Sequence, residues 1–458
     1  MEKNSAWKKR AGEIGDVFAV AEDYKAFISQ CKTERECVAW AVAEAKAAGF
    51  RDLAEVTEKG EALKAGDKVY AAHHGKTIML YVIGTDDIGK GMNLIGSHID
   101  SPRLDLKPNP LYEDTDLAMI ETHYYGGIKK YQWVALPLAL HGVICTKDGR
   151  TVTLALGEDP KDPVFGVSDL LIHLAQKQME KSASLVVEGE DLNAMVGSIP
   201  LADEEKEAVK KAILAKLKEE YGVEEADLVS AELTFLPAGP ARDYGFDRSM
   251  VMAYGQDDKV CAYPALRAIL HMDTPKRTCV TVLSDKEEVG SIGATGMQSR
   301  FFENTVTDVL RALGKDTAAA AGALSRSRML SADVTVAFDP NYPEVMEKKN
   351  CGYAGMGLGF NKYVGARGKS GSNDARAEYV ALIRRILDEA DVSYAVNELG
   401  RVDLGGGGTI SHFTAEYGMD VIDCGVPVFN MHAPWEITSK VDIYETLKGY
   451  EAFFAHGE

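Results

Sequence analysis

Hydrophobic residues near the start of the chain recur with helical spacing. Apolar positions repeat every three or four residues from Val17 to Ile28 and again from Cys37 to Ala48, which predicts two amphipathic helices. Thr33 and Glu36 fit a capping box at the start of the second helix, because a Thr N-cap and a Glu three residues later can satisfy each other's backbone N–H groups. The chain therefore opens with two helices.

Short apolar runs after these helices predict buried strands. Two such runs flank His73-His74-Gly75-Lys76, which predicts a hairpin over residues 68–83. The two adjacent histidines suit a metal, but Gly75 favours a plain hairpin tip at this position. The runs 94–100 and 278–283 are wholly or largely apolar, as expected for strands that are buried on both faces.

Helical and extended patterns alternate from residue 257 onward. Helices are predicted over residues 260–272, 302–313, 372–390 and 441–454, and strands over 278–283, 333–338 and 421–423. Such alternation is typical of an α/β protein. In α/β sheets, sites form beyond the carboxyl ends of the strands.

The stretch from residue 104 to residue 247 has a different character. It holds strands punctuated by proline and a charged amphipathic helix over 204–221, and it has few candidate metal ligands. We therefore predict a discontinuous catalytic domain, residues 1–103 and 248–458, with a second domain of residues 104–247 inserted into it.

Composition narrows the classes of function. The 458-residue chain carries a net charge of −19, which argues against a nucleic-acid partner and an anionic membrane surface. Its seven cysteines are scattered and form no Cys-x-x-Cys pair, which argues against a disulfide framework and a thiolate zinc site. The polar stretch Met1–Arg10 lacks the apolar core of a secretory signal, and no run approaches the roughly 20 apolar residues of a membrane span. These features predict a protein of the reducing cytoplasm.

Residues that bind metals recur where the predicted strands meet loops. The candidates are His98 with Asp100, Asp257 with Asp258, Glu287 with Glu288, Asp333, and His432. Imidazole and carboxylate groups are ligands that zinc accepts. Two metal ions roughly 3.5–4 Å apart can share a hydrolytic water. The set therefore predicts a two-zinc hydrolase.

The residue types suggest roles for some of these side chains. A zinc-bound His98 would give its second ring N–H to an outer acceptor, and Asp100 is placed to be that acceptor. Asp257 or Asp258 could bridge two metals with one oxygen on each. One of the two adjacent glutamates can bind metal while the other acts as general base. The spacing does not choose within either pair.

Substrate contacts are harder to identify. Gly407 and Gly408, in the run Gly405–Thr409, would let a substrate backbone approach closely, although a flexible turn without function has the same sequence. The run does not fit a phosphate loop, because no Gly-Lys-Ser/Thr follows it. Lys362 and Lys369 could contact an acidic substrate side chain, and both also suit a simple exposed surface.

Six motifs, taken together, resemble the aspartyl aminopeptidase/aminopeptidase I family in its bacterial form. They lie in the family's order at His98–Pro108, Gly255–Lys259, Glu287–Ser291, Ser331–Tyr342, Lys369–Ala375 and Met431–Glu436. The resemblance implies a zinc exopeptidase fold, with a mixed central sheet covered by helices on both faces. It also implies an inserted, mainly β, dimerisation or lid domain and a homo-oligomer, usually a tetrahedral dodecamer.

The same resemblance implies roles for individual residues. The ligands of two zinc ions would be His98, Asp257, Glu288, Asp333 and His432, with Glu287 as general base. The activity would be removal of N-terminal residues from peptides that have a free N-terminus, with cobalt or manganese as substitutes for zinc.

The chain departs from the family pattern in one place. Eukaryotic members carry histidine where this chain has Val336 and Asp339, and one such histidine reaches the active site of a neighbouring subunit. Asp339 cannot donate a proton as an imidazolium does. A preference for acidic N-terminal residues and a preference for neutral or apolar ones are therefore both open.

Two other classes of function compete with this interpretation. A two-zinc carboxypeptidase or N-acyl amino acid deacylase uses a similar ligand set, but a free carboxylate would call for an arginine near the site. Arg376 and Arg401 are the nearest candidates. A non-catalytic scaffold predicts that a ligand or the base is lost, and the motifs retain them all.

Overall fold

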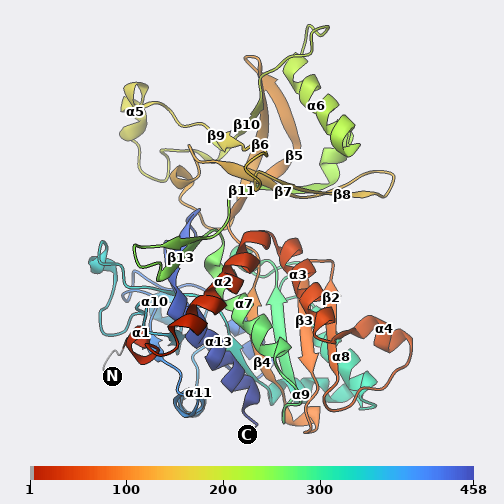
Figure 1. The fold of residues 1–458 in the computed structure, drawn as a ribbon, viewed down its shortest axis with the longest axis vertical. Coiled ribbons are helices and arrows are strands. Elements are labelled where there is room, and N and C mark those ends of the chain that lie inside the picture. Colours follow the sequence, from red (N-terminus) through yellow and green to blue (C-terminus); the bar gives the residue numbers. More distant parts are fainter. Residues whose placement is uncertain (1–4, 458) are drawn as a thin grey trace. The chain divides into compact units, whose positions relative to one another are not determined.

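The computed structural model describes residues 5–457, so the first four residues of the polar stretch Met1–Arg10 lie outside it. Two compact units are present (Figure 1). The first comprises Met1–Asp100, Ala241–Met431 and Glu436–Glu458, and the second comprises Ser101–Pro240 and His432–Trp435. The second unit therefore begins and ends a few residues before the predicted boundaries of 104 and 247. It also includes a short late segment that the sequence analysis assigned to the catalytic domain.

A nine-stranded sheet forms the centre of the first unit. Its strand order is β1-β2-β3-β14-β4-β15-β19-β17-β18. The strands are β1 (Arg51–Asp52), β2 (Lys68–His73), β3 (Thr77–Val82), β14 (Cys279–Ser284), β4 (Asn93–His98), β15 (Arg328–Ser331), β19 (Asp420–Gly425), β17 (Leu358–Asn361) and β18 (Tyr394–Asn397). The four central strands β14, β4, β15 and β19 are parallel, and β3 and β17 flank them in antiparallel orientation. The predicted mixed sheet is confirmed.

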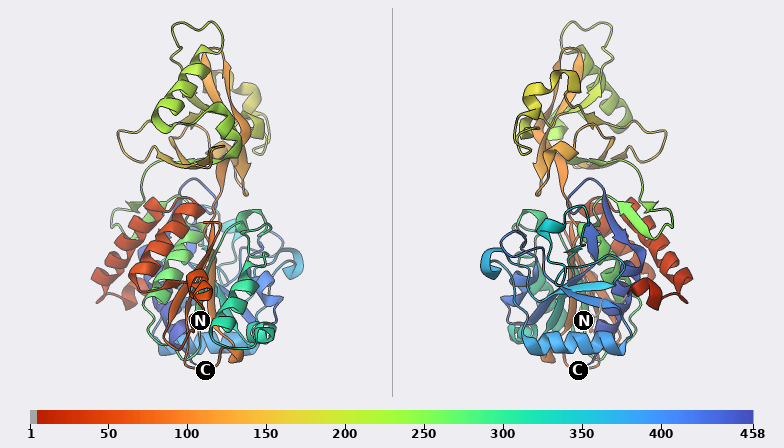
Figure 2. Two further views of the ribbon diagram at one scale, coloured as in Figure 1. Left: turned by 90° about the vertical axis from the view of Figure 1, so that its right-hand side faces the viewer. Right: turned by 90° about the vertical axis from the view of Figure 1, so that its left-hand side faces the viewer.

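Helices cover both faces of this sheet, as predicted (Figure 2). Alternate residues of β3 point into two separate hydrophobic clusters, with Leu80 in one and Tyr81 in the other. One cluster includes residues of α2 (Ile14–Gln30), α3 (Glu34–Ala47), α7 (Gln256–Leu270), α11 (Ala377–Glu389) and α13 (Lys440–Ala455). The other includes residues of α4 (Leu53–Glu58), α8 (Phe301–Ala312) and α9 (Ala320–Ser325). Burial on both faces explains why the central strands are apolar without alternation.

Smaller elements complete the first unit. A five-stranded sheet has the order β12 (Arg242–Tyr244), β13 (Met250–Ala253), β21 (Glu436–Ser439), β20 (Pro427–Phe429) and β16 (Thr335–Val336). The remaining helices are α1 (Ala6–Lys9), α10 (Ala366–Lys369), α12 (Ser411–Ala415) and the 3₁₀ turns η1 (Ile88–Lys90), η6 (Glu287–Val289), η7 (Thr317–Ala319) and η8 (Pro343–Val345). Because β12 pairs with β13, the chain has already returned to the first unit before residue 247.

The second unit is built on one antiparallel sheet of seven strands. Their order is β8 (Thr151–Leu156), β7 (Leu138–Cys145), β11 (Ala231–Pro237), β5 (Arg103–Asp114), β6 (Leu117–Tyr125), β10 (Ala194–Gly197) and β9 (Gly166–Val167). Its helices are α5 (Gln176–Met179), α6 (Ala208–Tyr221) and the 3₁₀ turns η2 (Lys130–Gln132), η3 (Ile172–Leu174), η4 (Gly189–Asp191) and η5 (Glu225–Ser230). The unit is mainly β, as the resemblance implied.

Local predictions succeed where the sequence signal is strong. The capping box of Thr33 and Glu36 is present, and the hairpin turns at His74 and Gly75, both of which have positive φ. The strand predicted over 333–338 is confirmed only in part, because β16 covers Thr335–Val336 alone, and the strand of the central sheet in this region, β15, ends at Ser331. That strand is only four residues long and starts with a charged residue, so it has no apolar run to mark it. Among the described residues, no helix combines the length and hydrophobicity that crossing a bilayer requires.

Candidate metal centre

The site is built at the carboxyl end of the central strand β4. His98 is the last residue of that strand and lies opposite Ser284, the last residue of β14. Both strands are buried along their whole length, and the His98 side chain is 2% exposed. The imidazole of His98 therefore lies at the carboxyl-terminal edge of the parallel strands, where α/β sheets form their sites.

The hydrogen bonds of His98 fix the orientation of its ring. Its Nδ1 lies 3.0 Å from the backbone oxygen of Asp100 and 3.3 Å from the Asp100 carboxylate, so Nδ1 carries the proton that is donated. Its Nε2 lies 3.2 Å from Oδ1 of Asp257. Burial alone lowers the pKa of His98, but hydrogen bonds with Asp100 and Asp257 outweigh burial and raise that pKa well above its usual value. The nitrogen that faces the carboxylates is thus the one available to a cation.

Asp257 and Asp258 occupy the start of α7, where the backbone departs from helical angles and the peptide bond between them is cis. Asp257 faces His98, and its backbone N–H donates to the buried carboxylate of Glu436 at 3.0 Å. Asp258 accepts hydrogen bonds from the Ser97 hydroxyl and, at 3.3 Å, from the backbone N–H of His98. Asp257 therefore joins the site, while Asp258 ties α7 to β4.

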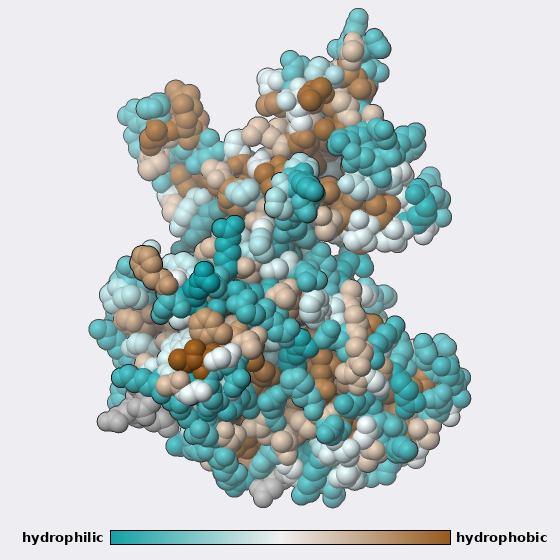
Figure 3. Space-filling model, viewed as in Figure 1, coloured by the Kyte–Doolittle hydropathy of each residue, from teal (hydrophilic) through white to brown (hydrophobic). Residues whose placement is uncertain are grey.

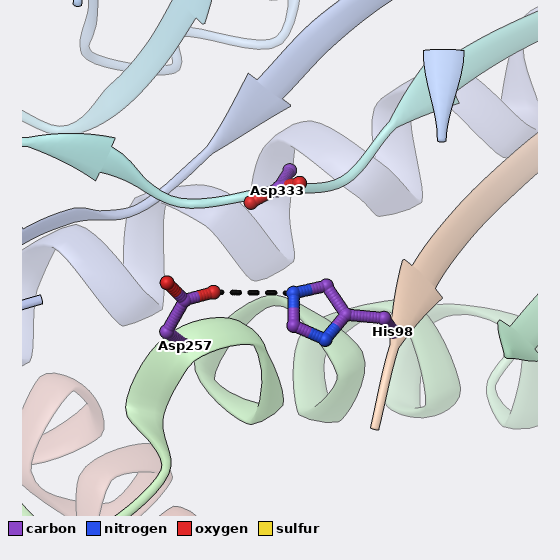
Figure 4. Close-up of side chains that lie close together, drawn as sticks. All are labelled: His98, Asp257 and Asp333. Carbon is purple, nitrogen blue, oxygen red and sulfur yellow. Dashed lines mark hydrogen bonds and ion pairs between the residues drawn. The ribbon is translucent and has the colours of Figure 1, made fainter. Parts of the chain in front are cut away.

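Asp333 completes a cluster of three buried side chains. It lies two residues after β15, and one ligand atom from each of His98, Asp257 and Asp333 lies within 4.8 Å of the other two (Figure 4). Burial raises the pKa of Asp333 well above its usual value, and nearby carboxylates, among them Asp258 and Glu287, add to the rise.

Glu287 and Glu288 enter the same region from a turn after β14. Lys286 and Gly290, on either side of η6, both have positive φ, so the chain reverses sharply here. Oε2 of Glu287 lies 3.9 Å from Nε2 of His98, and an oxygen of Glu288 lies within 4.8 Å of an oxygen of Asp257. The turn therefore directs both adjacent glutamates towards the cluster.

Asp100 holds this turn in place. Its two carboxylate oxygens accept the backbone N–H groups of Glu287 at 3.1 Å and of Glu288 at 3.2 Å. The same side chain lies beside the ring of His98. Asp100 thus connects β4 to both glutamates.

Replacing Asp100 with Asn is expected to weaken zinc affinity and activity by about 10–100-fold, because an amide cannot accept at both positions. Zinc titration and steady-state kinetics measure the two effects. The exposed Asp148→Asn change, which lies in the second unit, is the control. Wild-type zinc affinity and activity in Asp100→Asn would contradict this role.

The other predicted residues lie in different settings. His432 belongs to the second unit, where its Nδ1 lies 2.8 Å from the backbone oxygen of Gly127. Lys362 and Lys369 form ion pairs with Asp374 at 3.5 and 2.9 Å. In the glycine run, the backbone N–H of Gly407 donates to the Val364 carbonyl at 2.9 Å, and Gly408 is exposed.

Sequence reasoning missed two supporting carboxylates. Glu436, which holds the backbone of Asp257, stood in the last of the six motifs without an assigned role. Asp285 accepts the Thr295 hydroxyl at 2.6 Å and fixes the segment after η6, and burial raises the pKa of Asp285 to about 6. The signal for Asp285 was a charged residue directly after the apolar strand β14, and the signal for Glu436 was its place in the last motif. Neither signal reveals a supporting role until the hydrogen-bond partner of the carboxylate is known from the structure.

The chemistry of the cluster suits zinc. His98 offers a nitrogen, Asp257 and Asp333 offer oxygens, and all three side chains are buried. Burial and, after it, the nearby carboxylates raise the pKa of Asp333, and a divalent cation bound here would offset both effects.

Comparison with known proteins decides the family. The profile described as aminopeptidase I zinc metalloprotease (M18) matches residues 27–454. The chain belongs to the M18 aminopeptidase family. A probable M18 family aminopeptidase 1 of Clostridium acetobutylicum is 60% identical to this M18 aminopeptidase over 455 residues, which is 99% of this chain and 98% of the relative.

Solved structures agree with this assignment. The crystal structure of an M18 aminopeptidase from Thermotoga maritima has a TM-score of 0.95 and 43% identity, and covers 99% of each chain. A structure of the S. cerevisiae mApe1 dodecamer has a TM-score of 0.77 and 21% identity, with 96% of this chain and 97% of that chain covered, and it supports the fold alone. The M18 aminopeptidase described here is therefore a metalloaminopeptidase, a hydrolase that acts on peptide bonds.

Proposed function

We propose that this M18 aminopeptidase removes N-terminal residues with two zinc ions and a glutamate base. The cluster of His98, Asp257 and Asp333, with Glu287 3.9 Å from His98, is the observation that carries the proposal. Three buried ligands and an adjacent carboxylate are what metal-assisted hydrolysis requires.

The proposed ligands divide into two groups that share Asp257. His98 and Asp333 would hold one zinc ion, Glu288 and His432 would hold the other, and Asp257 would contribute to both. The proximity of Glu288 to Asp257 supports the second group, and family resemblance supplies His432. When bound, the ions would polarise the scissile carbonyl and lower the pKa of a shared water.

Glu287 is proposed to move the proton. Its side chain is 17% exposed, whereas that of His98 is 2% exposed, so a substrate can reach Glu287. It would take a proton from the attacking water and give it to the leaving amine. Asp100 would keep Glu287 in place by holding its backbone N–H.

The arginines that a competing carboxypeptidase or deacylase would need are already engaged. Arg376 contacts both carboxylate oxygens of Asp420, at 2.5 and 2.8 Å, and Arg401 donates to the Glu344 carbonyl at 2.8 Å. Neither is placed to recognise a free substrate carboxylate without giving up these bonds. The aminopeptidase proposal therefore stands ahead of both alternatives.

Hydrolysis of chromogenic aminoacyl substrates tests the proposal. The panel contains Asp, Glu, Leu, Met, Ala and Lys derivatives, each beside its N-acetylated form, with enzyme that has been stripped by chelator and reloaded with zinc, cobalt or manganese. We expect metal-dependent cleavage of the free-amine forms only. Equal cleavage of the acetylated forms, or no cleavage with any metal, would overturn it. The order of the cleavage rates shows whether the enzyme prefers acidic N-terminal residues, which Lys362 and Lys369 would contact.

Zinc affinity is expected to fall as the pH falls. His98 and Asp333 both have raised pKa values, so each holds its proton to a higher pH than usual, and zinc must displace that proton. As the pH falls through those raised values, affinity should weaken by roughly tenfold per pH unit for each proton displaced. Zinc titrations between pH 6 and 8 measure the slope, and a flat profile would contradict it.

The remaining proposals concern assembly and location. We propose a homo-oligomer, with a dodecamer as the size suggested by the yeast mApe1 structure, and with the second unit as the dimerisation or lid domain. Light scattering of the purified protein measures the size. A cytoplasmic location stays a prediction, and none of the seven cysteines forms a disulfide.

A further inference from the structure

A row of polar residues crosses the interior of the first unit. Hydrophilic residues are spread over the visible face of that unit in Figure 3, as expected where side chains meet water. Inside the central sheet, however, Ser331 of β15 lies opposite Asp423 of β19, which lies opposite Asn361 of β17. Each of the three is at most 1% exposed. A buried carboxylate is costly unless its bonds hold something in place, so Asp423 requires a reason.

The row lies close to the candidate metal centre. On its other side, Ser331 lies opposite Gly96 of β4. Gly96 is two residues before His98, and Ser331 is two residues before Asp333. Because a strand rises roughly 3.3 Å per residue, the row is about 7 Å from His98 along β4. Asp423 is therefore a buried carboxylate at the base of the site, although it is not one of the proposed ligands.

Asp423 binds the residue that ends the glycine run (Gly405–Thr409). Its Oδ1 accepts a hydrogen bond from the Thr409 hydroxyl at 2.6 Å. Burial raises the pKa of Asp423 to about 6, and hydrogen bonds from three neighbouring hydroxyl groups, among which that of Thr409 has the largest effect, limit the rise. The side chain is therefore mainly a carboxylate at neutral pH. Its bond from Thr409 is then charge-assisted, which is the stronger kind of hydrogen bond.

The chain passes from the surface into the core at Thr409. Gly408 is exposed, whereas Thr409 is 8% exposed and Ile410 only 1%. A Cβ atom placed on Gly96 would lie 3.2 Å from Cδ1 of Ile410, so the Ile410 side chain packs against β4 beside the row. Thr409 is thus the fixed end of the glycine run, and it joins the exposed glycines to the strands that carry the metal ligands.

We propose that Asp423, acting through Thr409, is a positioning residue that holds the glycine run where it contacts the substrate backbone. The inference rests on the proposed function, because it takes Gly407 and Gly408 as substrate contacts. Glycine has more backbone freedom than any other residue, so a run of four glycines needs a fixed end to present its backbone in one conformation. A run that is not held loses more freedom when substrate binds, which weakens binding. The bond therefore affects substrate affinity rather than zinc affinity.

Two substitutions of Thr409 test the proposal. Thr409→Val removes the hydroxyl and keeps the shape of the side chain, whereas Thr409→Ser keeps the hydroxyl. With zinc-loaded enzyme, Thr409→Val should raise KM by about tenfold and leave kcat and zinc content within about twofold of the wild type, because it removes support for binding and not for the chemical step. Thr409→Ser should have the wild-type KM. A wild-type KM in Thr409→Val, or loss of its zinc, would overturn the proposal.

Thr414→Val is the matched control. Thr414 is buried in α12, and its hydroxyl donates to the backbone carbonyl of Ser411 at 3.0 Å rather than to Asp423. Its loss should leave KM unchanged. A rise in KM as large as that of Thr409→Val would show that any buried hydroxyl of this helix has the same effect, and would overturn the specific role of Asp423.

Asp423→Asn tests the carboxylate itself. Asn has the same size and keeps an oxygen that accepts from Thr409, but it has no charge, so KM should rise by about threefold with the wild-type kcat. This variant stands by itself if Thr409→Val does not fold. In the double variant, KM should equal that of Thr409→Val alone, since both changes act on one bond. A wild-type KM in Asp423→Asn, or effects that simply multiply in the double variant, would overturn the proposal.

Backbone hydrogen exchange gives a readout that does not depend on hydrolysis. The amides of residues 405–410 should exchange faster in Thr409→Val than in the wild type or in Thr409→Ser. Equal exchange in the three proteins would overturn the positioning role. A wild-type protein that cleaves no substrate would overturn the proposed function instead, and the exchange rates would still report whether Asp423 and Thr409 hold the run.

Discussion

Replacing Glu287 with Gln is expected to lower kcat by about 10²–10⁴-fold, the usual contribution of a general base. Gln keeps the size of the side chain but cannot take a proton from water. The backbone N–H of residue 287 would still donate to Asp100, so the turn should keep its shape. Zinc content should therefore remain at the wild-type value while the rate falls.

The neighbouring residue provides the matched control for this experiment. Glu288→Gln alters a proposed zinc ligand, so it should reduce zinc content and activity together. Metal analysis beside steady-state kinetics separates the two variants. If Glu287→Gln lost zinc and Glu288→Gln kept it, the roles of the two glutamates would be exchanged. If Glu287→Gln kept wild-type activity, another group would be the base.

Replacing Asp257 with Ala is expected to abolish zinc binding and hydrolysis. Asp257 is the proposed ligand of both ions, so its loss should affect both. It would also leave Asp333 and His98 without the group that completes their cluster. Activity should fall below detection and should return little when excess zinc is added.

Asp258→Asn is the control for this change, because Asp258 is adjacent but bonds to Ser97 and His98 instead. Both bonds reach the same carboxylate oxygen, and Asn keeps one oxygen that can accept them. This variant should retain its zinc. Zinc loss in Asp258→Asn with retention in Asp257→Ala would show that the bridging carboxylate is Asp258, the choice that spacing alone left open.

The sequence predicted the central strands because both of their faces are buried. Residues 94–100 and 278–283 were recognised as strands from their apolar character. His98 and Glu287 were recognised as candidates because they lie at or just after the ends of these strands. The strand before Asp333 could not be found in this way. Its four residues begin with Arg328, and its stability comes from pairing with β4 and β19 rather than from its own pattern.

The candidate site was predictable as a set of residue types but not as a geometry. The order of the motifs identified His98, Asp257 and Asp333 as candidate ligands. These side chains come close together only because three separate chain segments lie at the same edge of the sheet. The roles of Glu436 and Asp285 depend on partners 179 and 10 residues away.

A crystal structure of the zinc-loaded protein, measured at the zinc absorption edge, tests the two-zinc site directly. We predict two anomalous peaks in each chain, one bound by His98 and Asp333, the other by Glu288 and His432, and both by Asp257. A single peak, or two peaks of which one does not contact Asp257, would contradict the two-zinc site.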